Sequence, residues 1–135
     1  LFEADQEWIE ALNCTFAPWK EKVEIIPKFI SDIDDNKNCS GDVFFRDKEI
    51  SFMKIDVDGG ERPLLSGFKQ IIQERPSMKI ALCTYHQHAD EQEFTSLLEG
   101  AGFDVAPSSG YMIFYYDKKL KEPYLRRALI RGEKK

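Results

Sequence analysis

Two apolar runs separated by a helical pattern constrain the fold of this chain more than any other feature. The runs are ISFMKIDV (50–57) and SMKIALCTY (77–85), and both have the composition of buried strands. Between them, Pro63 suits a first helical turn, and apolar residues recur at helical spacing to about Arg75. Strands joined by a crossover helix pair in parallel, so this segment predicts the centre of a mostly parallel sheet.

The alternation of strand and helix patterns continues on both sides of this unit. We expect helices over about residues 5–20 and 90–102, strands over residues 23–31, 103–107 and 111–117, a long surface loop over residues 34–48, and a last helix over about residues 122–131. The second and third of these strands flank a Ser-Ser-Gly turn signal and predict a hairpin. The order predicts one α/β domain, with a mostly parallel sheet, helices on both faces and a C-terminal antiparallel hairpin.

The composition argues against two classes of protein. The 135 residues include 19 basic and 24 acidic side chains, for a net charge of -5, so a nucleic-acid-binding surface is not expected. No apolar run approaches the ~20 residues of a membrane span. We expect a globular domain whose partners include neither nucleic acid nor a membrane. The basic residues between Lys118 and Lys135 are interpreted as a solvated helix face.

Cysteine usage indicates a reducing compartment. Cys14, Cys39 and Cys83 are odd in number and lack CxxC spacing, and Cys83 lies inside an apolar run, as a core residue does. Proteins of the cytosol rarely carry disulfides. With no signal peptide at the start of the sequence, we expect a cytoplasmic protein.

The stretch DVDGGE (56–61) places three carboxylates directly after a predicted buried strand. Asp56, Asp58 and Glu61 repel one another unless a cation, a hydroxyl-rich ligand or a proton relieves them. A turn closed by Glu61 as a helix cap explains part of the pattern, and Lys54 is available as a partner for Asp56. The glycines between the acids could form a phosphate-binding turn, but the flanking charges oppose an anion.

A second polar stretch, TYHQH (84–88), follows the next predicted strand. Ligands of open α/β sheets bind beyond the carboxyl ends of the strands, so these residues are expected to face the acidic turn. The acids are suited to Mg²⁺ or Ca²⁺, and the pair His86 and His88 is suited to a transition metal. Neither signal is specific alone, and we expect no metal.

FMKIDVDGGE (52–61) resembles the central motif of the FkbM-type S-adenosylmethionine-dependent methyltransferases, written Lys-Ile-Asp-Val-Glu-Gly-x-Glu. Asp58 replaces the commoner glutamate, and Gly60 takes the variable position. LFEAD at the N-terminus is similar to that family's second strand, FISD (29–32) to the segment after the third, and GYMIFYY (110–116) to the closing hairpin. The resemblance covers essentially the whole chain and implies a Rossmann-like fold.

The resemblance also implies roles for individual residues. Glu3 matches the acid that binds the ribose of S-adenosylmethionine, and Asp32 lies near the position that contacts adenine. Asp56 and Glu61 match acids close to the transferred methyl group, so that Asp56 also borders the cofactor. Methyl transfer is an in-line displacement that requires alignment and the removal of a proton. Asp56 and His86 are the candidate bases. The implied activity is O-methylation of a small-molecule or sugar hydroxyl.

The chain departs from the family pattern at its N-terminal end. The family's first strand and glycine-rich loop should precede LFEAD, and no GxGxxG-like stretch occurs here. We therefore expect a fragment that lacks the first strand and helix. The strands ending at Glu3 and Asp56 should then either pair directly or accommodate a second copy of the chain, giving a homodimer. Two other functions remain open: a non-catalytic partner-binding module, and a metal-dependent hydrolase or phosphotransferase that uses the acidic turn.

Overall fold

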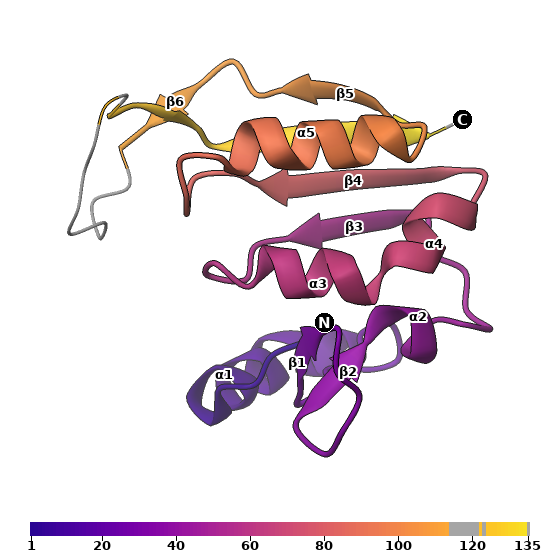
Figure 1. Cartoon of the computed structure of the whole chain (residues 1–135). Coiled ribbons are helices and arrows are strands. Elements are labelled where there is room, and N and C mark those ends of the chain that lie inside the picture. Colours follow the sequence, from indigo (N-terminus) through magenta and orange to yellow (C-terminus); the bar gives the residue numbers. More distant parts are fainter. Residues whose placement is uncertain (114–121, 123, 135) are drawn as a thin grey trace.

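The computed structural model describes residues 1–113, 122 and 124–134, and its helices and strands alternate along the chain (Figure 1). The helices are α1 (Gln6–Phe16), the 3-10 turn η1 (Ala17–Trp19), α2 (Gly41–Phe44), α3 (Glu61–Gly67), α4 (Lys69–Glu74) and α5 (Asp90–Gly100). The strands are β1 (Phe29–Ser31), β2 (Asn38–Ser40), β3 (Phe52–Ile55), β4 (Met78–Cys83), β5 (Asp104–Pro107), β6 (Tyr111–Met112), β7 (Arg126–Arg127) and β8 (Leu129–Lys134). The predicted α/β class is confirmed.

The main sheet has four strands in the order β3-β4-β8-β5. Strands β3 and β4 pair in parallel, with Ile55 opposite Leu82, as the two apolar runs predict. Strand β8 is antiparallel to both β4 and β5, and β1 pairs in parallel with β2 in a separate small sheet. The parallel pair β3–β4 places Asp56 and Thr84, the residues that follow these strands, at the same edge of the sheet.

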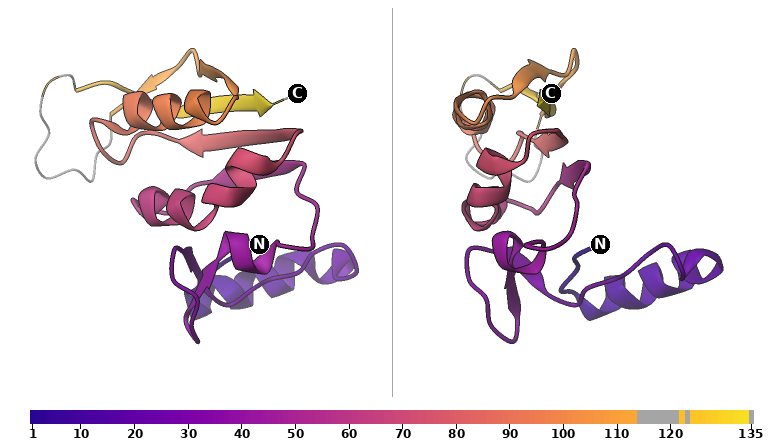
Figure 2. Two further views of the ribbon diagram at one scale, coloured as in Figure 1. Left: turned by 45° about the vertical axis from the view of Figure 1, so that its right-hand side comes forward. Right: turned by 90° about the vertical axis from the view of Figure 1, so that its right-hand side faces the viewer.

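Helices α3, α4 and α5 cover one face of the main sheet, and α1 lies on the other side, beside the N-terminal segment (Figure 2). The hydrophobic core forms between the covered face and these three helices. Its members are Ile55, Leu64, Leu65, Phe68, Ile71, Ile72, Met78, Ile80, Leu82, Phe94, Leu98, Phe103 and Ile130. The crossover helix predicted between the two runs is present as α3 and α4, with a break at Phe68. None of the described helices is long and apolar enough to cross a membrane.

The helix predicted over residues 122–131 is wrong, because most of this segment forms β7 and β8. Leu125, Leu129 and Ile130 have a spacing that also fits a helix. In β8, however, exposure alternates: Ile130 and Gly132 are buried and Arg131 is exposed. Pairing on both edges of β8 supplies backbone hydrogen bonds, and this tertiary context outweighs local propensity.

The predicted hairpin between residues 103–107 and 111–117 has different partners in the structure. Strand β5 pairs with β8, and β6 pairs antiparallel with β7, with Tyr111 opposite Arg127. The C-terminal antiparallel hairpin is therefore β6–β7, while the rest of the predicted second strand, after Ile113, lies outside the described residues. The prediction of a loop over residues 34–48 is also incomplete, because β2 and α2 lie within it.

The N-terminal segment does not pair with β3. Phe2 forms a bridge with Ile26, and β3 is an edge strand of the main sheet among the residues described here. A cavity of about 450 Å³ lies between them, lined by Phe2, Ile30, Met53, Asp56 and Phe68 among others. The expected direct pairing of the two strands is therefore wrong for this chain. The alternative, a gap filled by a second copy, stays a prediction.

Gly67 allows α3 to lie against the end of β1. A Cβ atom at this position would overlap the carbonyl oxygen of Ser31. We expect Gly67→Ala to destabilise the fold by about 1–3 kcal/mol through this overpacking, measured by urea unfolding. Gly100→Ala is the matched control, since its Cβ would meet no atom within 4 Å. An equal effect of the two substitutions would contradict the close contact between Gly67 and Ser31.

Candidate active site at the carboxyl ends of β3 and β4

Asp56, Glu61 and His86 come together where β3 and β4 end. One ligand atom from each side chain lies within 4.8 Å of the others. Asp56 directly follows β3, Glu61 begins α3, and His86 belongs to the loop after β4. The parallel pairing of β3 with β4 causes this convergence, as the sequence predicts for side chains at the carboxyl edge.

The turn between Asp56 and Glu61 has a specific backbone conformation. Asp58 and Gly59 have φ angles of 50° and 94°, and Gly60 N–H donates to the carbonyl of Val57 at 2.9 Å. Glu61 Oε1 in turn accepts a hydrogen bond from Val57 N–H at 3.2 Å. The turn thereby inserts a fully buried carboxylate, Glu61, beneath the exposed side chain of Asp58. The predicted turn is therefore present, but Glu61 does not cap α3: the N-cap residue is Gly60, no side chain caps the helix, and the Glu61 carboxylate accepts from Val57 N–H in the turn.

His86 lies between two carboxylates. Its Nδ1 atom is 3.1 Å from Glu61 Oε1, and its Nε2 atom is 3.6 Å from Asp58 Oδ1. The side chain is 5% exposed, and its ring centroid lies 4.2 Å from that of Tyr85, with the two ring planes tilted by 37°. The contact with Glu61 fixes the orientation of the ring, in the way that a carboxylate orients a catalytic or metal-binding histidine.

Asp56 is held by two neighbours while remaining accessible to solvent. The Tyr85 hydroxyl donates to Asp56 Oδ1 at 2.8 Å, and Lys54 Nζ lies 3.4 Å from Oδ2. Partial burial works to raise the pKa of Asp56, but the hydrogen bonds from Tyr85 and Cys83 and the charge of Lys54 outweigh it, so this pKa is lowered. Asp56 is therefore ionised near neutral pH, and the predicted pairing with Lys54 is confirmed.

The partners of Asp56 keep their protons. Burial, followed by the hydrogen bond to Asp56, raises the pKa of Tyr85 well above its usual range. Burial lowers the pKa of Lys54, but its contacts with Cys83 and Asp56 outweigh this, so the net shift is upward. Burial also raises the pKa of Cys83. The cluster thus presents one carboxylate with a hydroxyl donor on one oxygen and a neighbouring cation near the other.

Tyr85→Phe is expected to raise the pKa of Asp56 toward its ordinary value, because one stabilising donor is lost. A lowered folded-state pKa adds stability that is present above the unfolded-state pKa and disappears as pH falls through the folded-state value. The stability difference between wild type and Tyr85→Phe should therefore be largest near neutral pH and shrink below ~3.9. Urea unfolding across this range measures it, with exposed Tyr124→Phe as control. A difference that does not change with pH would rule out the coupling.

The two residues expected to bind the adenosine part of a cofactor lie on the N-terminal segment. Glu3 Oε1 accepts hydrogen bonds from the backbone N–H groups of Ala4 and Asp5 at 2.7 and 2.8 Å. Asp32 is exposed and follows β1. Their neighbours Phe2 and Ile30 line the 450 Å³ cavity that reaches Asp56, although Glu3 and Asp32 do not themselves line it.

His88 is exposed and does not belong to the cluster of Asp56, Glu61 and His86.

Arg126 supports the site and was missed by sequence reasoning. Its side chain is 6% exposed, and Nη1 donates to the carbonyl oxygens of Tyr85 and His86 at 2.7 and 3.1 Å. Thr84 Oγ1 also donates to the carbonyl of Arg127 at 2.8 Å. The interpretation of this basic segment as a solvated helix face is wrong at Arg126. No local signal separates it from the neighbouring basic residues, because its partners are about forty positions away.

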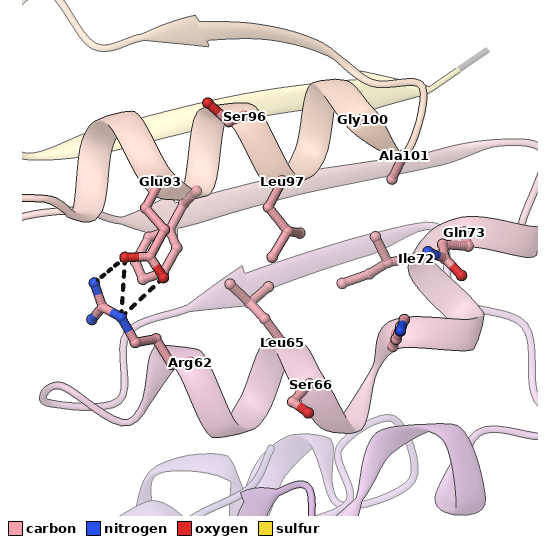
Figure 3. Close-up of a pocket in the computed structure, with 12 residues that line it drawn as sticks. Arg62, Leu65, Ser66, Ile72, Gln73, Glu93, Ser96, Leu97, Gly100 and Ala101 are labelled. Carbon is pink, nitrogen blue, oxygen red and sulfur yellow. Dashed lines mark hydrogen bonds and ion pairs between the residues drawn. The ribbon is translucent and has the colours of Figure 1, made fainter.

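A cavity of about 510 Å³ lies between α3, α4 and α5 (Figure 3). Arg62 and Glu93 close one end of it through hydrogen bonds of 2.6–3.2 Å, and Leu65, Ile72 and Leu97 line its walls. None of the three clustered residues lines this cavity. Its Arg62 and Glu93 side chains already pair with each other, so the strand ends remain the candidate.

Comparison with known proteins agrees with this fold. No known protein-family profile and no curated protein sequence matches the chain. Among solved structures, a methyltransferase FkbM from Methylobacillus flagellatus KT superimposes with a TM-score of 0.71 at 16% sequence identity. The match covers 97% of this chain and 35% of that one, so this chain spans about a third of its length. The chain therefore has the α/β fold of an FkbM methyltransferase.

Proposed function

We infer that the protein is an S-adenosylmethionine-dependent methyltransferase that acts on a hydroxyl group of a small molecule or sugar. The observation that supports this most is the convergence of Asp56, Glu61 and His86 at the carboxyl ends of neighbouring parallel strands, in a chain with an FkbM methyltransferase fold. This edge is where α/β sheets bind ligands.

The charge of the site suits a cationic ligand. Asp56, Asp58 and Glu61 lie within six residues of one another. Lys54 contacts Asp56, and His86 contacts Asp58 and Glu61. When bound, S-adenosylmethionine supplies a methyl group on a positively charged sulfur. Each carboxylate within a few ångströms of that charge is favourable by about 1–4 kcal/mol, and would disfavour a phosphate by a similar amount.

We propose that residues of the N-terminal segment bind the adenosine part of the cofactor. Backbone donors hold Glu3 Oε1 in place, and no hydrogen bond from a described residue reaches Oε2, which is available to a ribose hydroxyl. Asp32 would contact the adenine, and Asp56 would lie at the methyl end. The cavity between the N-terminal segment and β3 supports this assignment, because Phe2 and Ile30, which are close to Glu3 and Asp32 in the sequence, line it together with Asp56.

The transfer step requires an acceptor hydroxyl to lose its proton as the oxygen attacks. Asp56 is ionised and its Oδ1 is oriented by Tyr85, so this carboxylate can accept the hydrogen bond of the hydroxyl and align it. His86, oriented by Glu61, is the second group that can accept the proton. The chain thus provides alignment and proton removal.

Calorimetry with S-adenosylhomocysteine tests the proposal. We expect saturable binding, and we expect Glu3→Ala to weaken it by about 1–3 kcal/mol through loss of charge-assisted hydrogen bonds to the ribose. Glu10→Ala, an exposed glutamate of α1 paired only with Gln6 in the described part of the chain, is the matched control. Absence of binding heat would reject cofactor binding by these 135 residues, which lack a glycine-rich loop. Binding that Glu3→Ala leaves unchanged would reject the role of Glu3 alone.

A further inference from the structure

The side chains of Asp56, Glu61 and His86 have the separations of ligands around one metal ion. Two ligands bound cis at ~2.1 Å from a metal lie about 3 Å from each other. Glu61 Oε1 and His86 Nδ1 are 3.1 Å apart, and an oxygen of Asp56 completes a set that fits within 4.8 Å. A hydrogen bond would also explain the first distance, so further observations are needed.

Glu61 provides one such observation. Its side chain is fully buried, and its Oε2 atom accepts no hydrogen bond from any residue that the structure describes. A buried carboxylate oxygen without a partner is costly, because it has lost its hydration. A cation bound by Oε2, or by both oxygens, would compensate that loss. Val57 N–H already fixes Oε1, so the carboxylate is held in position.

Asp58 provides a further observation. Its carboxylate faces Nε2 of His86, on the opposite side of the ring from Glu61. A carboxylate there favours the tautomer with the proton on Nε2, which leaves the lone pair of Nδ1 directed toward Glu61. Metal-binding histidines commonly have this arrangement, with an outer carboxylate facing the second ring nitrogen. The positive charge of Lys54 near Asp56 opposes a cation, but Lys54 is 48% exposed and can turn toward solvent.

We propose that Asp56, Glu61 and His86 form a binding site for one divalent transition-metal ion of the Mn²⁺ or Zn²⁺ type. A nitrogen ligand beside two carboxylates favours these ions over Ca²⁺ and Mg²⁺. Three protein ligands leave positions open on the solvent side, where the side chain of Asp56 is 42% exposed. A hydroxyl bound there would have a lowered pKa, so the ion would replace a protein base. This proposal departs from the expectation, drawn from the sequence, that the protein binds no metal. Binding of the ion does not depend on methyl transfer.

Titration of the protein with Mn²⁺ tests the site, with the concentration of unbound Mn²⁺ measured by its electron paramagnetic resonance signal. We expect one saturable site per chain, and we expect Glu61→Gln and His86→Gln each to weaken it by at least about 100-fold. Asp58→Asn, which removes the outer carboxylate, should weaken it by about 10-fold. Glu133→Gln is the control, because that carboxylate pairs with Lys79 and lies outside the cluster. Asp56→Asn, at a partly exposed position, tests the site without altering a buried group.

Three outcomes would overturn the proposal. The first is no saturable binding of Mn²⁺ or Zn²⁺, which would leave a hydrogen bond as the explanation of the 3.1 Å contact. The second is binding that resists all of the ligand substitutions, since the ion would then lie elsewhere. The third is Ca²⁺ binding as tightly as Mn²⁺, because His86 would not then be a ligand. None of these measurements uses the methyltransferase reaction or its cofactor.

Discussion

Asp56→Asn is expected to lower the turnover of methyl transfer by about 10²–10⁴-fold while leaving the affinity for S-adenosylhomocysteine nearly unchanged. The amide keeps the size of the side chain and can still accept the Tyr85 hydrogen bond through its oxygen. It removes the negative charge that aligns the acceptor hydroxyl and attracts its proton. Initial rates at saturating acceptor, combined with calorimetry, separate the two quantities.

The control for this substitution is Asp47→Asn, since Asp47 is exposed and lies in a loop outside the site. Neither turnover nor affinity should change in that variant. An equal loss of turnover and affinity in Asp56→Asn would place Asp56 in the cofactor-binding shell and not beside the methyl group. Repeating the rates with added Mn²⁺ also shows whether the loss depends on a metal, because Asp56 is a proposed ligand.

The two central strands could be predicted because each is specified by its own residues. Strands β3 and β4 are continuous apolar runs, and the helical pattern between them requires a crossover. Their parallel pairing then fixes which residues meet at the carboxyl edge. This is why Asp56, Glu61 and His86 could be brought together from the sequence, although the exclusion of His88 could not. If residues 86–88 were extended, the side chains of His86 and His88 would point to the same side. These residues form a loop, and the sequence does not show which of its side chains point toward the site.

Strand β8 could not be predicted because its structure depends on neighbours distant in the sequence. Its position between β4 and β5 requires partners that precede it in the sequence by 23 residues (Pro107 and Ile130) to 56 residues (Met78 and Lys134). The residues LIRGEK read equally well as a short amphipathic helix. Gly132 allows the close approach of β8 to Phe103, because a Cβ there would lie 3.1 Å from the ring of Phe103. This contact is known only from the structure, so the glycine could not identify the strand in the sequence. The same long-range dependence concealed β2 and α2, where Ser40 and Asp42 hydrogen-bond to α3 and α4.

Arg126→Met is expected to destabilise the fold by about 3 kcal/mol, the largest stability effect predicted for a single polar side chain here. Arg126 is nearly buried and donates to two carbonyl groups, those of Tyr85 and His86. Methionine fills similar volume but donates no hydrogen bond, so both acceptors would lose their charged partner. Urea unfolding gives the free-energy difference.

Arg131→Met is the control for this prediction, since Arg131 is exposed on β8 and its loss should change stability by less than about 0.5 kcal/mol. The two substitutions remove the same charge from the same C-terminal segment, so a general charge effect would lower both equally. That result would contradict the specific role of Arg126.

If Arg126 holds the carbonyl groups of Tyr85 and His86, the loop that carries these two residues becomes more mobile in Arg126→Met even where the protein stays folded. The pKa of Asp56 should then rise in Arg126→Met, because the Tyr85 donor is no longer held at 2.8 Å. An NMR titration of the Asp56 carboxyl group would detect this rise, which a loss of stability confined to the β7–β8 segment would not produce.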